Sequence, residues 1–73
     1  MTVATIVDVM ESWPLGLRLR FEGESSDELR DLAEGCEIKR AEASADPADL
    51  RVGMRVSVDR AALVLHHVEI LLF

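Results

Sequence analysis

The sequence predicts one mainly β domain over residues 1–73, a small five-stranded β-barrel with one short α-helix. Several segments alternate apolar and polar residues with the period of a β-strand. Hydrophobic residues make up 49% of the chain but include only two Phe, one Trp and no Tyr, so the core is expected to be aliphatic. A chain this short can bury only a small core. A sheet that closes into a barrel encloses such a core on all sides.

The first two predicted strands form a hairpin. Residues 2–10 are almost wholly apolar and rich in Val, Ile and Thr, which is typical of a central strand covered on both faces. The sequence Trp-Pro-Leu-Gly that follows has the turn chemistry to reverse the chain. In residues 15–22, leucines alternate with Arg18 and Arg20. We therefore expect the leucines inside and the arginines outside.

A short helix is predicted over residues 26–34. Ser25 and Glu28 have the spacing of a capping box, and Gly35 suits the position just after a helix end. The apolar face of this helix would consist of Leu29, Leu32 and Ala33. Residues 36–41 are a weaker strand candidate, whose charged side chains favour the edge of the sheet.

A single helical turn and a strand are predicted next. Asp46 is a suitable N-cap and Pro47 a suitable first helical residue, so residues 46–49 should form one turn. From Val52 to Val58 the chain alternates, with Val52, Met54, Val56 and Val58 on one face. Gly53 interrupts the other face, which indicates either a positive φ or a close approach of backbone.

The last segment, residues 63–73, is apolar on both faces. Val64, Val68, Ile70 and Leu72 would share one face, and Leu63, Leu65 and Leu71 the other. A helix is also compatible with this run, but its β-branched residues favour a strand. Because several predicted strands are apolar on both faces, some of their apolar side chains should stay exposed on a monomer, unless the predicted helix covers them.

Charge and composition limit the classes of partner. The net charge is −6, which disfavours nucleic-acid binding, since such proteins must neutralise phosphates. The single cysteine, Cys36, excludes an internal disulfide and an all-cysteine zinc site. Neither a signal peptide nor an apolar run long enough to cross a bilayer is evident. We expect a cytoplasmic protein without a membrane partner.

The run Asp-Pro-Ala-Asp-Leu-Arg-Val-Gly-Met-Arg-Val at residues 46–56 resembles the closing part of the OB-fold domain in small proteins that accompany acyl-CoA thiolases and hydratases. The Leu-Arg-x-Gly element within it also resembles the accessory TOBE barrels of transporter ATPases. These resemblances imply a small OB-like barrel. The first family carries a four-cysteine zinc ribbon, for which this chain lacks the cysteines, and its main helix follows the third strand instead of the second.

No side-chain constellation in the sequence indicates catalysis, a cofactor or a metal. His66 and His67 are adjacent, so a regular strand would point them to opposite faces and away from one shared ion. Cys36 would follow a helix C-terminus, whose dipole raises a thiol pKa. We therefore predict a protein that is not an enzyme.

The first functional hypothesis is a protein-interaction or accessory subunit that self-associates. Its contacts would come from the C-terminal strand with Phe73, or from the turn at Trp13, a residue that could also cover one end of the barrel. The alternative is a barrel that binds a small anion through Arg18, Arg20 and Arg55. Nucleic-acid binding ranks third, because no strand carries paired aromatic residues for stacking bases.

Overall fold

The structure, a computed structural model, describes residues 1–11 and 15–72. This part of the chain is mainly β and contains no α-helix. Its elements are, in order, β1 (Thr2–Met10), β2 (Gly16–Phe21), β3 (Glu28–Arg40), β4 (Ala43–Ala45), the 3-10 turn η1 (Pro47–Asp49), β5 (Arg55–Val58) and β6 (Val64–Leu72). The prediction of a mainly β domain is confirmed.

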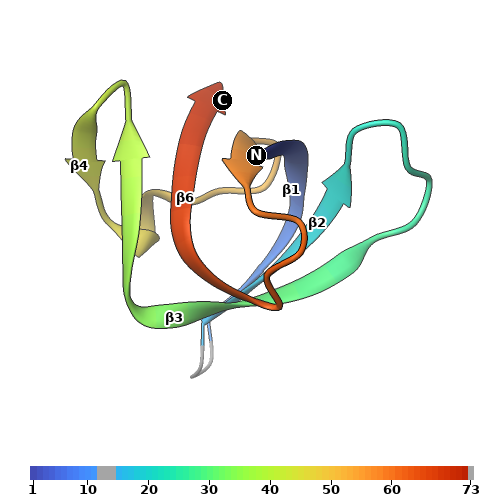
Figure 1. The fold of residues 1–73 in the computed structure, drawn as a ribbon, viewed down its shortest axis with the longest axis horizontal. Coiled ribbons are helices and arrows are strands. Elements are labelled where there is room, and N and C mark those ends of the chain that lie inside the picture. Colours follow the sequence, from blue (N-terminus) through green and yellow to red (C-terminus); the bar gives the residue numbers. More distant parts are fainter. Residues whose placement is uncertain (12–14, 73) are drawn as a thin grey trace.

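Five of the strands form a closed ring. β1 pairs antiparallel with β2 on one side and β5 on the other, and β2 pairs antiparallel with the first part of β3. β6 completes the ring between β5, to which it is antiparallel, and β3, to which it is parallel. β4 pairs with the second part of β3 only and stands beside the ring (Figure 1).

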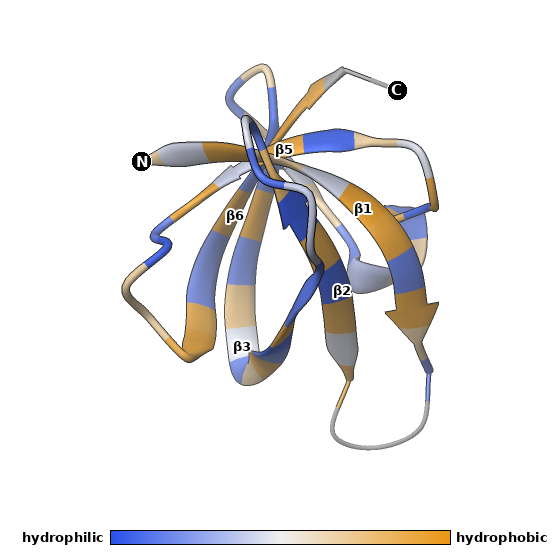
Figure 2. Cartoon of the chain, turned by 90° about the vertical axis from the view of Figure 1, so that its right-hand side faces the viewer, coloured by the Kyte–Doolittle hydropathy of each residue, from blue (hydrophilic) through white to orange (hydrophobic). Residues whose placement is uncertain are grey.

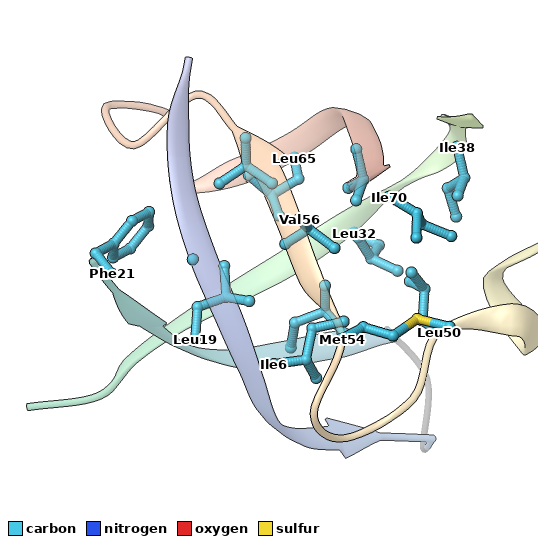
Figure 3. Packing of buried hydrophobic residues seen from close by; sticks show 14 residues of the cluster. Ile6, Leu19, Phe21, Leu32, Ile38, Leu50, Met54, Val56, Leu65 and Ile70 are labelled. Carbon is cyan, nitrogen blue, oxygen red and sulfur yellow. The ribbon is translucent and has the colours of Figure 1, made fainter. Parts of the chain in front are cut away.

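Apolar side chains from every ring strand fill the interior (Figure 3). The buried set is Ala4, Ile6, Leu17, Leu19, Phe21, Leu32, Ile38, Leu50, Met54, Val56, Val58, Leu65, Val68 and Ile70. On β2 the leucines are buried while Arg18 and Arg20 are exposed, as the alternation predicted. A large inward side chain stabilises the fold by about 1.5–3 kcal/mol through burial.

The predicted helix over residues 26–34 is wrong. Most of these residues belong to β3, a strand of 13 residues whose backbone pairs with β2, β6 and β4. A nine-residue helix is marginal without tertiary support, whereas the strand satisfies its backbone groups on both sides. Gly35 has a φ of 74° and lies where β3 bends and its register with β6 shifts, so its positive φ serves a bend instead of a helix end.

Residues 36–41 do not form the sheet edge that their charges suggested. Most of them belong to the second half of β3, which has β6 on one side and β4 on the other. The edge is β4, a strand that the sequence did not predict. It joins β3 through Ala41 and Glu42, which have φ values of 50° and 70°, a conformation that non-glycine residues rarely adopt.

The turn chemistry around β5 is confirmed. Asp46 and Pro47 begin η1 as predicted, and the backbone N–H of Asp46 donates to the Asp49 carboxylate at 3.0 Å. Gly53 has a φ of 96°, with nothing within 4 Å of where a Cβ would lie, so its role is the positive φ. Val52 was expected to face the core, but it lies in the turn and is 57% exposed.

The last segment is a strand, as the β-branched residues indicated, but its faces differ from the prediction. Leu65, Val68 and Ile70 are all buried, whereas Val64 is exposed. The pairing register between β6 and β3 shifts opposite the bend in β3. Because of this shift, the inward-facing residues of β6 change from odd-numbered to even-numbered positions at His66 and His67.

Candidate protein-interaction surface

The three arginines of the anion hypothesis lie on one outer face of the ring. Thr5 on β1 pairs with Arg20 on β2 and with Arg55 on β5, so these three residues form one row across the strands. Arg18 lies two residues from Arg20 on the same face of β2. The structure therefore brings the three predicted contact residues into one neighbourhood.

Two of these arginines already bind carboxylates. Arg20 Nε is 2.8 Å from Asp27 Oδ1, and Arg55 Nη2 is 3.2 Å from Glu22 Oε2. Exposed pairs of this kind contribute about 0–1 kcal/mol each, yet an incoming anion would have to compete with them. Among the described residues, Arg18 is the arginine of this group without an ion-pair partner.

The other residues singled out from the sequence are placed as follows. Trp13 and Phe73 lie outside the described residues. His67 Nδ1 is 3.0 Å from Glu37 Oε1, across the parallel pair of β6 and β3, while His66 is exposed. In the described ranges, no group of three or more His, Cys, Asp or Glu side chains could hold a metal ion.

Cys36 follows a bend in a strand, so the helix dipole expected to act on its thiol is absent. Burial raises the pKa of this thiol, and the negative charge of Glu37 adds to the effect. Both causes favour the protonated thiol over the thiolate nucleophile.

A charged cluster that the sequence did not reveal covers the ring of the buried Phe21. Glu28 accepts hydrogen bonds from Arg30 at 2.7 Å and from Arg60 at 3.0 Å, and the guanidinium groups of both arginines lie over the Phe21 ring, at 4.7 Å from its centroid for Arg60. Arg60 also donates to Glu24 at 2.7 Å. The cluster ties the start of β3 to the loop between β5 and β6.

The cluster shifts the titration of its members. The hydrogen bond from Arg30 lowers the pKa of Glu28 against an opposing effect of desolvation, and the bond from Arg60 lowers it further. The bond to Glu24 is the main cause that raises the pKa of Arg60. Arg30 itself is buried, and its Nε has no hydrogen-bond partner among the described residues. The carboxylates of Glu24 and Glu28 already bind these arginines, so an incoming anion would have to compete with them.

Exposed apolar side chains gather where β3 and β6 begin. We call the residues Leu29, Leu63 and Val64 the β3–β6 corner. Leu63 is 74% exposed, Leu29 54% and Val64 42%. Val64 pairs with Asp31, and Leu29 precedes Asp31 by two residues on the same outer face. Leu29 and Val64 are thus diagonal neighbours on the outer face.

A hollow of about 300 Å³ lies between the N-terminus and the first part of β6, and the corner residues are not among those that line it. It is lined by Met1, Asp59, Ala62, Leu65, His66 and His67. Met1, which lines this hollow, is 72% exposed. Figure 2 shows the apolar colouring at the start of β6, beside β3.

Sequence reasoning identified only part of this surface. The apolar residues on both faces of 63–73 did indicate exposure, and Leu63 and Leu71 are exposed. Leu29 was placed on the inner face of a helix that does not form. A strand period applied to residues 28–32 would have put Leu29 outside and Arg30 inside, but a buried arginine is an unusual expectation without its partners.

In the described part of the chain, no helix is long and apolar enough to cross a membrane. Comparison of the chain with protein-family models, with curated proteins and with solved structures finds no match.

Proposed function

We propose that this chain is a non-catalytic interaction module built on an OB-type barrel. The strand order supports the architecture: β5 lies beside β1 after a long connection from β3, which gives the order of a Greek key, and β6 then closes the ring. The 3-10 turn η1 follows the third ring strand, where the OB family has its main helix.

The observation that carries the function is the exposed β3–β6 corner. The interior of the ring is already filled by the buried set, so the corner residues are not part of the core. Contiguous apolar side chains on the surface of a small protein are typical of interaction sites. Leu29 and Val64 share the outer face of the ring, and the exposed Leu63 directly precedes Val64 in the chain.

Self-association is the form of interaction that we propose. The test is sedimentation velocity over a wide range of micromolar concentrations, with Leu63→Ser as the variant and Val52→Ser as its matched control. Both residues are exposed apolar residues outside the strands, and only Leu63 belongs to the corner. We expect the parent and Val52→Ser to associate with rising concentration, and Leu63→Ser to associate more weakly.

Two results would contradict the proposal that the chain self-associates through the corner. A parent chain that stays at 8.1 kDa over the whole range would contradict self-association. Equal weakening by the two serine variants would show that the corner is not the contact. A stable contact should bury more than about 1,000 Å² in total, so it would extend beyond the corner.

A further inference from the structure

We infer that the β3–β6 corner binds a second copy of this chain about a two-fold axis, with Arg18 of each protomer against Asp31 of the other. This inference rests on the proposed function and names its partner and orientation. It follows from the way in which charged and apolar side chains alternate around the corner.

Three strand registers place the side chains. Arg18 on β2 pairs with Leu29 on β3, and Gly16 on β2 pairs with Asp31 on β3. Asp31 in turn pairs with Val64 on β6. The outer face therefore has one row with Arg18 and Leu29 and a second row with Gly16, Asp31 and Val64. Arg18 and Asp31 are diagonal neighbours across β2 and β3, and Leu29 and Val64 are diagonal neighbours across β3 and β6.

Two charged groups beside the corner, those of Arg18 and Asp31, are open to a partner. Arg18 and Asp31 are exposed, and neither forms an ion pair with another described residue. Asp8 faces Arg18 on β1, but its Oδ1 accepts the backbone N–H of Val9 at 2.9 Å. A Cβ built at Gly16 would lie 3.5 Å from Asp31 Oδ1 and 3.3 Å from Met10 Cε, so the Met10 side chain lies over this glycine, next to the exposed carboxylate.

This pattern matches its own copy. In a two-fold interface, residue i of one protomer contacts residue j of the other, and j contacts i. An axis that exchanges the positions of Arg18 and Asp31 makes two contacts of opposite charge and brings the two Leu29 side chains together near the axis. An axis passing through Arg18 would instead set like charges against each other.

The overall charge makes such local pairing necessary. Each chain carries a net charge of −6, so two copies repel one another at long range. Around Leu29 the outer face carries Arg18 together with Asp8 and Asp31, so a second copy can set a group of opposite charge against Arg18 and against Asp31. Charge complementarity at a contact also selects the orientation of the partners. A second copy thus fits this surface better than an acidic partner or a wholly basic one.

Charge reversal with mixing tests the inference. Arg18→Glu alone would set two carboxylates against each other at each contact, and Asp31→Arg alone would set two guanidinium groups together. We expect each variant by itself to associate at least about tenfold more weakly than the parent in sedimentation experiments.

Mixed in equal amounts, the two variants should form a heterodimer. One of its two contacts joins the unaltered Arg18 of one protomer to the unaltered Asp31 of the other. The second contact joins the carboxylate introduced at position 18 to the guanidinium introduced at position 31. Both contacts of the mixed dimer therefore have opposite charges, whereas both contacts of either variant alone have like charges.

Matched controls are available on the same chain. Arg51→Glu and Glu42→Arg reverse exposed charges in turns away from the corner and should not change the association constant. Thermal melts of all variants check the fold. If a reversal lowers the melting temperature, Arg18→Gln and Asp31→Asn replace it, and each should weaken association severalfold.

The outcomes distinguish the two-fold arrangement from self-association in general. Weak association of the single variants together with a heterodimer in the mixture supports the two-fold arrangement. If the single variants associate like the parent, or the mixture stays monomeric, the arrangement is wrong while self-association stands. If the neutral variants Arg18→Gln and Asp31→Asn associate like the parent, the arrangement is also wrong. A monomeric parent overturns both the arrangement and the proposed function.

Discussion

Gly53→Ala is the substitution whose effect follows most directly from the backbone. Gly53 has a φ of 96°, and no atom lies within 4 Å of an added Cβ, so the substitution meets no steric obstacle. The cost is conformational, because a left-handed conformation is less favourable by about 1–2 kcal/mol for an L-residue. Alanine also lowers the entropy of the unfolded chain, but this gain of about 0.4–1 kcal/mol is smaller.

The chain cannot avoid this cost by relaxing the turn. The N–H of Gly53 donates to the carbonyl of Ile6 at 2.8 Å, and the N–H of Ile6 donates to the carbonyl of Met54 at 2.9 Å. A return to negative φ would disturb both bonds, at about 1 kcal/mol each. The net fall in the free energy of unfolding should therefore be about 1 kcal/mol for Gly53→Ala, and larger for Gly53→Val.

Thermal and urea unfolding measure this loss. For a domain of this size the change for Gly53→Ala corresponds to a fall of roughly 4–8 °C in melting temperature. A chemically synthesised chain with D-alanine at position 53 is the matched control, because it adds the same methyl group while favouring positive φ. It should be at least as stable as the parent. If the L-alanine chain melts like the parent, the backbone role of Gly53 is refuted.

Three other perturbations have expected outcomes. Replacing Ala41 by Asn and Glu42 by Gly should raise the free energy of unfolding by about 1–2 kcal/mol in urea titrations, since Asn and Gly suit the positive φ values of the turn between β3 and β4. An unchanged urea midpoint would show that Ala41 and Glu42 are not strained in this turn. The pKa of Glu28 is lowered in the folded chain, so the stabilisation from its ionised carboxylate should be complete above the ordinary glutamate pKa and lost as the pH falls through the folded pKa. The difference in stability between the parent and Glu28→Gln should therefore close in acid. A difference that persists in acid would exclude this charge effect. Ile70→Ala, which empties a buried position between β5 and β3, should cost about 2–5 kcal/mol in urea unfolding, and a loss below about 1 kcal/mol would mean that the end of β6 is not in the core.

The parts of the fold that local chemistry decides could be predicted from the sequence. The alternation in residues 15–22 identified the buried and exposed faces of β2, and Asp46 and Pro47 identified the helical turn before β5. The positive φ of Gly53 was one of two options that the residue type allowed. In each case the signal and the structure lie within a few residues of one another, so no distant contact was needed.

The segment that became β3 could not be predicted in this way. Leu29, Leu32 and Ala33 have helical spacing, and Ser25 with Glu28 has capping-box spacing, yet both signals are short. The strand is selected by pairing with β2 and β6, which are distant in sequence. It also places Arg30 against the Phe21 ring, which is acceptable because Glu28 and carbonyl oxygens receive its N–H groups.

The same change of secondary structure accounts for both the closed ring and the candidate surface. As a helix, residues 26–34 could have covered the outer apolar groups with Leu29, Leu32 and Ala33, and the monomer would then have been complete. As a strand, they bury Leu32 inside the ring and turn Leu29 outward, beside Val64. The surface is therefore a consequence of closing the ring through β3, because a strand that turns one face to the interior must present the other to solvent or to a partner.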